Sequence, residues 1–166
     1  MTRYQNRHNK ADGQNFEALI VHSCQNYKRL NLAMIDKTPE PMRVARPMGK
    51  GKFLAFFERK AQPDFKGVLR TGRSICFEAK HTNTSRATFN QLKEWQLNYL
   101  KNHERLGGHS FILLGVQMSY FYKIPVQTWE NMKQRYGRLY MTLEELEPYR
   151  VQSKNGLIDF LKTNPN

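Results

Sequence analysis

The sequence predicts a domain of mixed helices and strands, in the α/β class, with a basic β-hairpin that projects from it. Apolar residues at helical spacing predict helices over 14–30 and 88–103. Alternating apolar and polar residues predict strands between and after these helices. The segment 42–60 carries charge almost entirely of one sign and has two β-prone arms around a turn, which indicates the hairpin. With 166 residues the chain is most simply one domain, 1–166, long enough to bury a core.

The N-terminal half begins with a basic stretch, 1–13, that we expect to form a flexible arm. Helix 14–30 follows, because Phe16, Ile20 and Cys24 recur at a spacing that places them on one face. A strand is expected over 32–37, and two short strands within 62–80 are expected to join near Thr71-Gly72.

The C-terminal half opens with Thr88-Phe-Asn-Gln91, which has the form of a capping box and predicts the start of the helix 88–103. Phe89, Leu92, Trp95, Tyr99 and Leu100 form the expected apolar stripe of this helix. The remaining elements are expected to be strands over 109–118 and 120–124 and helices over 125–136, 142–147 and 157–161.

Composition favours a polyanionic partner. Lys and Arg total 27 against 14 Asp and Glu, which gives a net charge of +13 and a pI near 9.9. Nucleic acid is the commonest partner for such an excess, although a generally basic protein without a nucleic-acid role would share it. The first ten residues are too polar for a signal peptide, and the longest apolar run, Phe111–Val116, is too short to span a bilayer. We therefore expect no membrane association and a cytoplasmic location.

Few residues suit a zinc site or a disulfide. The five histidines are scattered, and the two cysteines, Cys24 and Cys76, lie in segments that we expect to be apolar. Reduced, buried thiols of this kind fit a reducing compartment.

The central strands gather three polar groups. In the second strand, Glu78 and Lys80 share a face because side chains alternate with period two. Asp64 starts the first strand, and its face depends on the loop. A two-residue loop would turn it to the wrong face. A three-residue loop at Thr71–Arg73, or a bulge at Gly67, would place it opposite Lys80.

Two carboxylates and a lysine on one patch are unfavourable as structure and useful as chemistry. Like charges repel at short range, and a hard divalent cation such as Mg²⁺ would satisfy both Asp64 and Glu78. Lys80 could then position a water molecule or neutralise charge on a phosphate. The alternative is an edge hairpin with a solvated Glu–Lys pair and an aspartate that starts a turn.

Two further polar residues lie near predicted buried faces. Glu17 stands at the border of the apolar face of the first helix, where it is either solvated or directed into a site beneath the helix. Gln96 lies between Leu92 and Leu100 and is expected to face inward, either as a satisfied core amide or as a ligand.

The basic hairpin has a turn at 47–51 and the aromatic residues Phe53, Phe56 and Phe57, not all of which alternation can expose. It would either contact nucleic acid or be an edge hairpin kept soluble by its charge. Its candidate DNA-binding residues are Arg43, Arg46, Lys50, Lys52, Arg59 and Lys60.

In order, these features resemble the PD-(D/E)xK nuclease superfamily, whose core motif matches Pro63-Asp64 and Glu78-Ala79-Lys80. Within it the chain resembles the RecU-type Holliday junction resolvases, also called penicillin-binding-protein-related factor A. The resemblance runs from Gly13 over nearly the whole chain. It rests on Gly13–Glu17, Lys37-Thr-Pro39, Asp64–Gly67, Phe77–Lys80 and the helix that carries Gln96.

The resemblance implies a restriction-endonuclease-like mixed sheet flanked by helices, and a homodimer that cuts two strands of a four-way DNA junction. The implied cofactor is Mg²⁺, with Mn²⁺ as a substitute. By position, Asp64, Glu78 and Gln96 would hold the metal, Lys80 would stabilise the transition state and Glu17 would complete the acidic cluster. The hairpin 42–60 would match the stalk of the family, which enters the junction. The resemblance also implies a place at the bacterial nucleoid and is compatible with a recombinase partner.

The chain also departs from the family. Where the family carries a threonine ligand two residues before the aspartate, this chain has Gln62, which offers only a neutral amide oxygen to the metal. The segment between Asp64 and Glu78 is one residue longer, which fits a three-residue loop, and the short N-terminal arm resembles a phage-borne version.

Three functions are therefore compared: a junction-resolving endonuclease, a nuclease of the same superfamily that cuts ordinary duplex DNA, and a basic DNA-binding protein without catalysis. Only the two enzymes need Asp64, Glu78 and Lys80 together.

Overall fold

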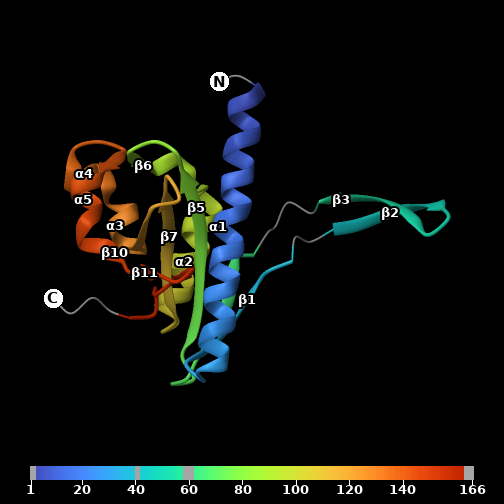
Figure 1. Ribbon diagram of the computed structural model, residues 1–166, viewed down its shortest axis with the longest axis horizontal. Helices are drawn as coiled ribbons and strands as arrows, with labels where there is room; N and C mark the ends of the chain where they lie inside the picture. Colours follow the sequence, from blue (N-terminus) through green and yellow to red (C-terminus); the bar gives the residue numbers. More distant parts are fainter. Residues whose placement is uncertain (1–2, 40–41, 58–61, 163–166) are drawn as a thin grey trace.

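A six-stranded mixed sheet forms the centre of the molecule and confirms the predicted α/β class (Figure 1). The structure is a computed structural model that describes residues 3–39, 42–57 and 62–162. The sheet has the order β1-β4-β5-β7-β8-β10, in which β5 and β7 are parallel and the other neighbours antiparallel. Its strands are β1 (Ala33–Lys37), β4 (Phe65–Leu69), β5 (Ser74–Thr82), β7 (His109–Val116), β8 (Tyr120–Pro125) and β10 (Arg150–Val151).

Three strand pairs lie outside this sheet: β2 (Met42–Gly49) with β3 (Lys52–Phe57), β6 (Arg86–Thr88) with β9 (Tyr140–Thr142), and β11 (Ser153–Lys154) with β12 (Leu157–Ile158). The helices are α1 (Arg3–Arg29), α2 (Glu94–Arg105), α3 (Val126–Glu130), α4 (Met132–Tyr136) and α5 (Leu143–Leu146), with 3₁₀ turns η1 (Phe89–Gln91) and η2 (Glu147–Tyr149). In the described part of the chain no helix is long and apolar enough to cross a bilayer.

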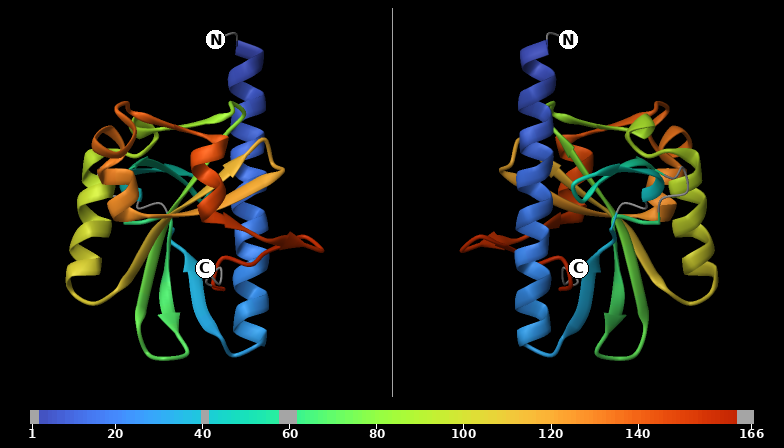
Figure 2. Two further views of the ribbon diagram at one scale, coloured as in Figure 1. Left: turned by 90° about the vertical axis from the view of Figure 1, so that its left-hand side faces the viewer. Right: turned by 90° about the vertical axis from the view of Figure 1, so that its right-hand side faces the viewer.

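Two apolar clusters cover the two faces of the sheet, and Figure 2 shows α1 and α2 on opposite sides of it. On the α1 side, Phe16 and Ile20 pack with Phe77 of β5, and the C-terminal Ile158 and Phe160 complete this cluster. The other cluster joins α2, α3 and the opposite faces of β5, β7 and β8. Because β5 alternates between the two clusters, every second side chain from Cys76 onward faces α2.

Helix α1 begins at Arg3, well before the predicted start at residue 14. The extension is tied to the body, because Asn83 Nδ2 donates to Asp12 Oδ2 at 2.8 Å. The predicted helix 125–136 is divided into α3 and α4 at Asn131. Both predicted capping boxes are present, but the one at Thr88 caps η1 rather than α2.

The helix predicted over 157–161 is wrong. Asn155 and Gly156 both have positive φ (54° and 72°), so they form a tight turn that pairs β11 with β12. The stripe predicted on α2 is also partly wrong, since Trp95 and Tyr99 are 37% and 42% exposed and Leu97 is buried in their place. Cys24 and Cys76 are buried free thiols, as expected.

The hairpin β2–β3 extends away from the body (Figure 1). Its turn is Lys50-Gly51, with φ of 51° and 72°, so it is tighter than the predicted turn at 47–51. Phe53 and Phe56 are 62% and 61% exposed, although they differ by three positions in the strand. The expectation that alternation buries at least one of the three phenylalanines stays a prediction for Phe57. The side chain of Phe57 lies outside the described residues.

Candidate functional site

The turn between β4 and β5 sets the position of the candidate site. Phe65 pairs with Phe77 and Val68 with Ser74, so Leu69 and Arg73 close a three-residue loop at 70–72. Gly72, with φ of 82°, takes the last loop position, where the left-handed conformation favours glycine. The loop therefore lies one residue earlier than predicted.

This register places Asp64 next to Glu78 and corrects the expectation that it would lie opposite Lys80. Pairing extended by one residue from Phe65 and Phe77 sets Asp64 beside Glu78, on the same face of the sheet. Asp64 Oδ2 accepts from the Ala79 N–H at 2.9 Å. It lies 3.8 Å from Lys80 Nζ, so the three predicted residues do converge.

Glu78 is fully buried between β5 and α2. Its Oε2 accepts from Lys80 Nζ at 3.0 Å and from Gln96 Nε2 at 2.6 Å, whereas its Oε1 has no hydrogen-bond partner among the described residues. Burial raises the pKa of this carboxyl to about 8; the charge of Asp64 acts in the same direction, and Lys80 opposes it. Without a further cation, the site therefore favours the protonated form of Glu78 at neutral pH.

Gln96 faces inward from the first turn of α2, as predicted. Its Oε1 accepts from the Lys93 N–H at 3.0 Å, and its Nε2 donates to Glu78. The amide thus fixes the Glu78 carboxylate to the start of α2. The ligand role predicted for Gln96 would require its amide oxygen to turn toward the carboxylates.

Glu17 and Gln62 have other partners. Glu17 Oε2 accepts from Lys37 Nζ at 2.6 Å, and Lys37 lies at the end of β1. The next residue, Thr38, donates its N–H to the Asp64 carbonyl at 2.8 Å, so Glu17 is connected to the site through this segment. Gln62 is exposed, and its side-chain oxygen accepts from Lys66 Nζ. The roles predicted for Glu17 and Gln62 stay predictions.

The donor set fits a hard divalent cation. In the described residues no group of three or more His, Cys, Asp or Glu side chains is arranged to hold a metal. Two carboxylates nevertheless meet here, and one of them has a buried oxygen, Glu78 Oε1, without a hydrogen bond. Leaving such an oxygen unpaired is costly, and Mg²⁺ bound by one or two carboxylates and water would satisfy it.

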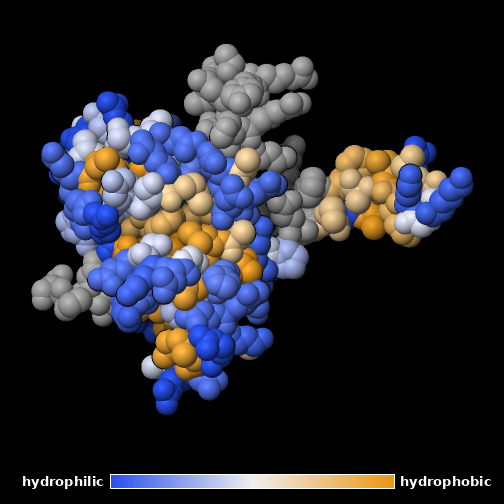
Figure 3. All heavy atoms as spheres, viewed as in Figure 1, coloured by the Kyte–Doolittle hydropathy of each residue, from blue (hydrophilic) through white to orange (hydrophobic). Residues whose placement is uncertain are grey.

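The predicted DNA-binding residues that the structure describes are all exposed on β2–β3: Arg43, Arg46, Lys50 and Lys52. Arg59 and Lys60 lie outside the described residues. Figure 3 shows hydrophobic residues over most of this hairpin and hydrophilic ones at its tip. The exposed apolar side chains are Met42, Val44, Met48, Phe53 and Phe56.

Sequence reasoning missed two features near the site. Thr38 has a buried hydroxyl without a hydrogen-bond partner among the described residues, one position after the lysine that pairs with Glu17. Beyond the end of β5, Arg86 and Arg138 each stack on the Tyr140 ring, at 4.8 and 4.7 Å from its centroid. Arg86 meets Tyr140 through the pairing of β6 with β9, so no local pattern revealed this contact.

Comparison with known proteins gives a family match over nearly the whole chain. The family model described as "RecU: Recombination protein U" matches residues 11–164. A protein of Bacillus pumilus (strain SAFR-032) named Holliday junction resolvase RecU is 30% identical over 144 residues, which is 81% of this chain and 69% of that protein.

Proteins with the same name from other bacteria show similar sequence identity and coverage. The one from Pediococcus pentosaceus is 27% identical over 164 residues, covering 90% of this chain and 81% of that protein. The one from Staphylococcus aureus (strain JH9) is 26% identical over 166 residues, covering 90% and 78%. Among solved structures, Hjc of Archaeoglobus fulgidus, a Holliday junction resolvase, aligns with a TM-score of 0.42 at 16% identity, over 70% of this chain and 75% of that one.

Proposed function

The chain belongs to the recombination protein U (RecU) family, and from this premise we propose that it is an endonuclease that resolves four-way DNA junctions in recombination and repair. The observation that carries the catalytic part is the convergence of Asp64, Lys80 and the fully buried Glu78. A protein that only bound DNA would have no use for a buried carboxylate with an unpaired oxygen.

The proposed cofactor is Mg²⁺, which Mn²⁺ could replace. Asp64 and Glu78 would hold it, and the sequence adds Gln96 and Gln62 as further predicted ligands. When bound, the ion supplies Lewis-acid stabilisation of charge on the reacting phosphate and lowers the pKa of a bound water.

Lys80 is the residue that would act on the substrate. Its Nζ is 3.0 Å from Glu78 Oε2 and 3.8 Å from Asp64 Oδ2, and its side chain remains 18% exposed. The two carboxylates would keep the ammonium in place, and its partial exposure would leave it accessible to a substrate. From there it would donate to a phosphate oxygen or orient the attacking water.

Two surfaces would bind the DNA. The basic residues of β2–β3 stand clear of the body, where they can follow phosphates at the open centre of a junction. Arg86 is exposed beyond the end of β5, and none of the described carboxylates pairs with it. Stacking on Tyr140 would hold its guanidinium ready for a phosphate.

A homodimer would supply the two sites that symmetric cutting of two strands requires. The exposed apolar residues of β2–β3 support this assembly. A two-stranded hairpin is marginally stable alone, and apolar side chains collected on such an element indicate an interface. The second hairpin of a dimer would cover them. The proposed place of action is DNA in the cytoplasm.

The test compares a synthetic four-way junction with a linear duplex of the same sequence. We expect cleavage of the junction, loss of activity with EDTA and recovery with Mg²⁺ or Mn²⁺. Equal cleavage of both substrates would favour the duplex nuclease, and no cleavage with any divalent metal would favour a binding protein.

The hairpin is tested by the double change Arg43→Ala and Arg46→Ala, with Arg105→Ala at the end of α2 as the control. Each lost phosphate contact should flatten the slope of log affinity against log salt by about 0.9. Junction binding should weaken more than duplex binding. An equal loss on both would reduce the hairpin to a general phosphate-binding surface.

A further inference from the structure

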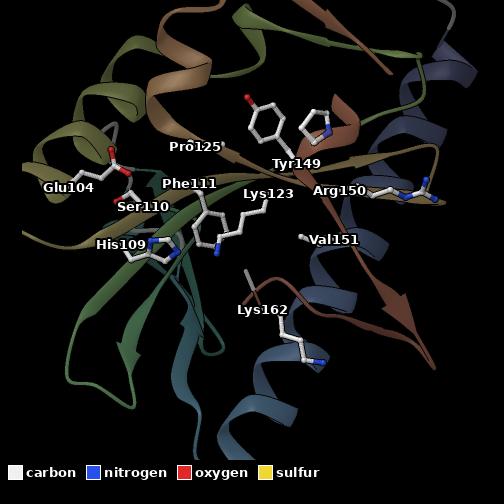
Figure 4. A pocket seen from close by; sticks show the side chains of 11 residues that line it. Glu104, His109, Ser110, Phe111, Lys123, Pro125, Tyr149, Arg150, Val151 and Lys162 are labelled. Atoms are coloured by element: carbon white, nitrogen blue, oxygen red, sulfur yellow. The ribbon is translucent and has the colours of Figure 1, made fainter. Parts of the chain in front are cut away.

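A cavity of about 360 Å³ lies on the sheet face that α1 and the C-terminal segment share, opposite the face that carries Glu78 (Figure 4). Strands β7, β8 and β10 form its floor through Phe111, Lys123 and Val151. Cavities of several hundred Å³ are the usual size of small-ligand sites. The proposed nuclease chemistry makes no use of this one.

Lys123 is a cation on the floor of this cavity. It is partly buried, and its Nζ lies 4.8 Å from the centroid of the Phe111 ring. None of the described carboxylates forms an ion pair with it. Figure 4 shows its ammonium beside the Phe111 ring, inside the ring of lining residues. A partly buried cation without an anion is unfavourable unless something else compensates it.

The other charged groups around the cavity do not neutralise Lys123. Arg150 and Lys162 stand at its rim and are cations themselves; they pair with Glu147 at 3.3 Å and Asp159 at 2.6 Å. Glu104 is the acid among the lining residues, on the opposite side at the end of α2.

His109 adds a polar group without a charge. Burial lowers its pKa to about 4, and the charges of Lys123 and Arg73 act in the same direction, so the ring is neutral at pH 7. Burial lowers the pKa of Lys123 itself to about 8, and no neighbouring carboxylate raises it again. An anion beside the ammonium would reverse that shift.

We propose that this cavity binds a phosphate group, held by Lys123 on its floor with Arg150 and Lys162 at its rim. Of these three cations, Lys123 is the one that no described carboxylate pairs with, so its charge is what favours an anion here. The cavity is large enough for a phosphate together with the group it is attached to. Phe111, Val151 and Tyr149 give that group apolar contact. The phosphate comes either from a free phosphate compound or from the backbone of bound DNA. A free phosphate compound would make the site independent of the proposed nuclease function, whereas a backbone contact would rest on the DNA binding proposed above.

Selective acylation of the Lys123 amine tests the proposal on the full chain. At about pH 7.5 an amine of pKa about 8 is roughly one quarter neutral, whereas an ordinary lysine is neutral to about one part in a thousand. Lys123 should therefore react roughly 200-fold faster per accessible amine than exposed lysines such as Lys154, as read by peptide mass spectrometry. Increasing concentrations of inorganic phosphate should slow the acylation of Lys123 by about tenfold or more, because a nearby anion raises the pKa of a lysine by about one unit or more.

Acylation of Lys123 in the presence of inorganic phosphate and in the presence of a saturating four-way junction separates the two sources of the phosphate. Slower acylation with inorganic phosphate but not with the junction indicates a small-molecule site. Slower acylation with both indicates a contact to the DNA backbone. Lys123→Met should abolish phosphate binding measured by ³¹P NMR, while Lys154→Met should leave it unchanged. Lys123→Arg keeps the charge and should retain binding, which separates loss of the cation from loss of fold. An acylation rate of Lys123 that does not change at any phosphate concentration would overturn the proposal.

Discussion

Glu78 offers a direct physical test of the site, because its protonation is coupled to folding. The change is Glu78→Gln, which preserves shape and removes the ionisable group, studied in EDTA so that no metal compensates the charge. Glu78 is fully buried, and its pKa is raised from 4.5 to about 8. The folded state therefore holds a proton that the unfolded chain has released at neutral pH.

The sign and size of the effect follow from that difference. Between the two pKa values the unfolded state binds fewer protons, so the free energy of unfolding falls as pH rises. The loss of stability caused by Glu78 is small below the pKa that this carboxyl has in the unfolded chain. It is complete only above the pKa that it has in the folded state. From about pH 5 to about pH 8 it grows by about 3 kcal/mol, as an order of magnitude, for the wild type alone. The stability of Glu78→Gln relative to wild type should rise by that amount.

Urea unfolding at several pH values measures this difference, because the other titrating groups contribute to both proteins alike. Glu144→Gln, on the exposed side of α5, is the matched control and should show no such trend. Mg²⁺ should stabilise the wild type more than Glu78→Gln at about pH 8, since a bound ion favours the ionised carboxylate. A relative stability that does not change with pH would refute the buried, uncompensated carboxylate on which the reasoning rests.

Three further outcomes are expected. Lys80→Ala should lower junction cleavage by about a hundredfold or more while leaving junction affinity nearly unchanged in a gel-shift assay; cleavage near the wild-type rate would remove Lys80 from the mechanism. The proposed dimer should sediment as a monomer at micromolar concentration after Phe53→Ser with Phe56→Ser, whereas a dimer that both changes leave intact would place the interface elsewhere. Gly67→Ala should lower stability by about 3 kcal/mol or more in thermal unfolding, because its Cβ would lie 2.0 Å from the Met34 carbonyl oxygen; wild-type stability would contradict this close approach.

The strands and the polar patch were predictable because each depends on short-range rules. Alternation placed Glu78 and Lys80 on one face, and the structure confirms it. The position of Asp64 was predicted less well, because it depends on which residue of the turn adopts a left-handed conformation. Gly72 fixes that register, and one residue of difference moves Asp64 from Lys80 to Glu78.

Features that depend on tertiary contacts could not be predicted in this way. Helix α1 extends toward the N-terminus with Asp12 held by Asn83, a pairing between residues far apart in the sequence. The orientation of Gln96 follows from two partners, Lys93 and Glu78, that a helical stripe does not specify. The error at 157–161 had a readable signal, the Asn155-Gly156 pair, which is typical of a tight hairpin turn.

Two features of the metal-free single chain are unfavourable for stability, and both are relieved by what the proposed function requires. Glu78 keeps a buried oxygen without a hydrogen bond, which a divalent cation would satisfy. The β2–β3 hairpin exposes apolar side chains that a second copy would cover. Departures from good packing and good pairing concentrate where a protein binds something. Because the two features lie on different elements and call for different partners, removing the proposed metal and disrupting the proposed dimer should lower stability independently, with additive effects on the free energy of unfolding.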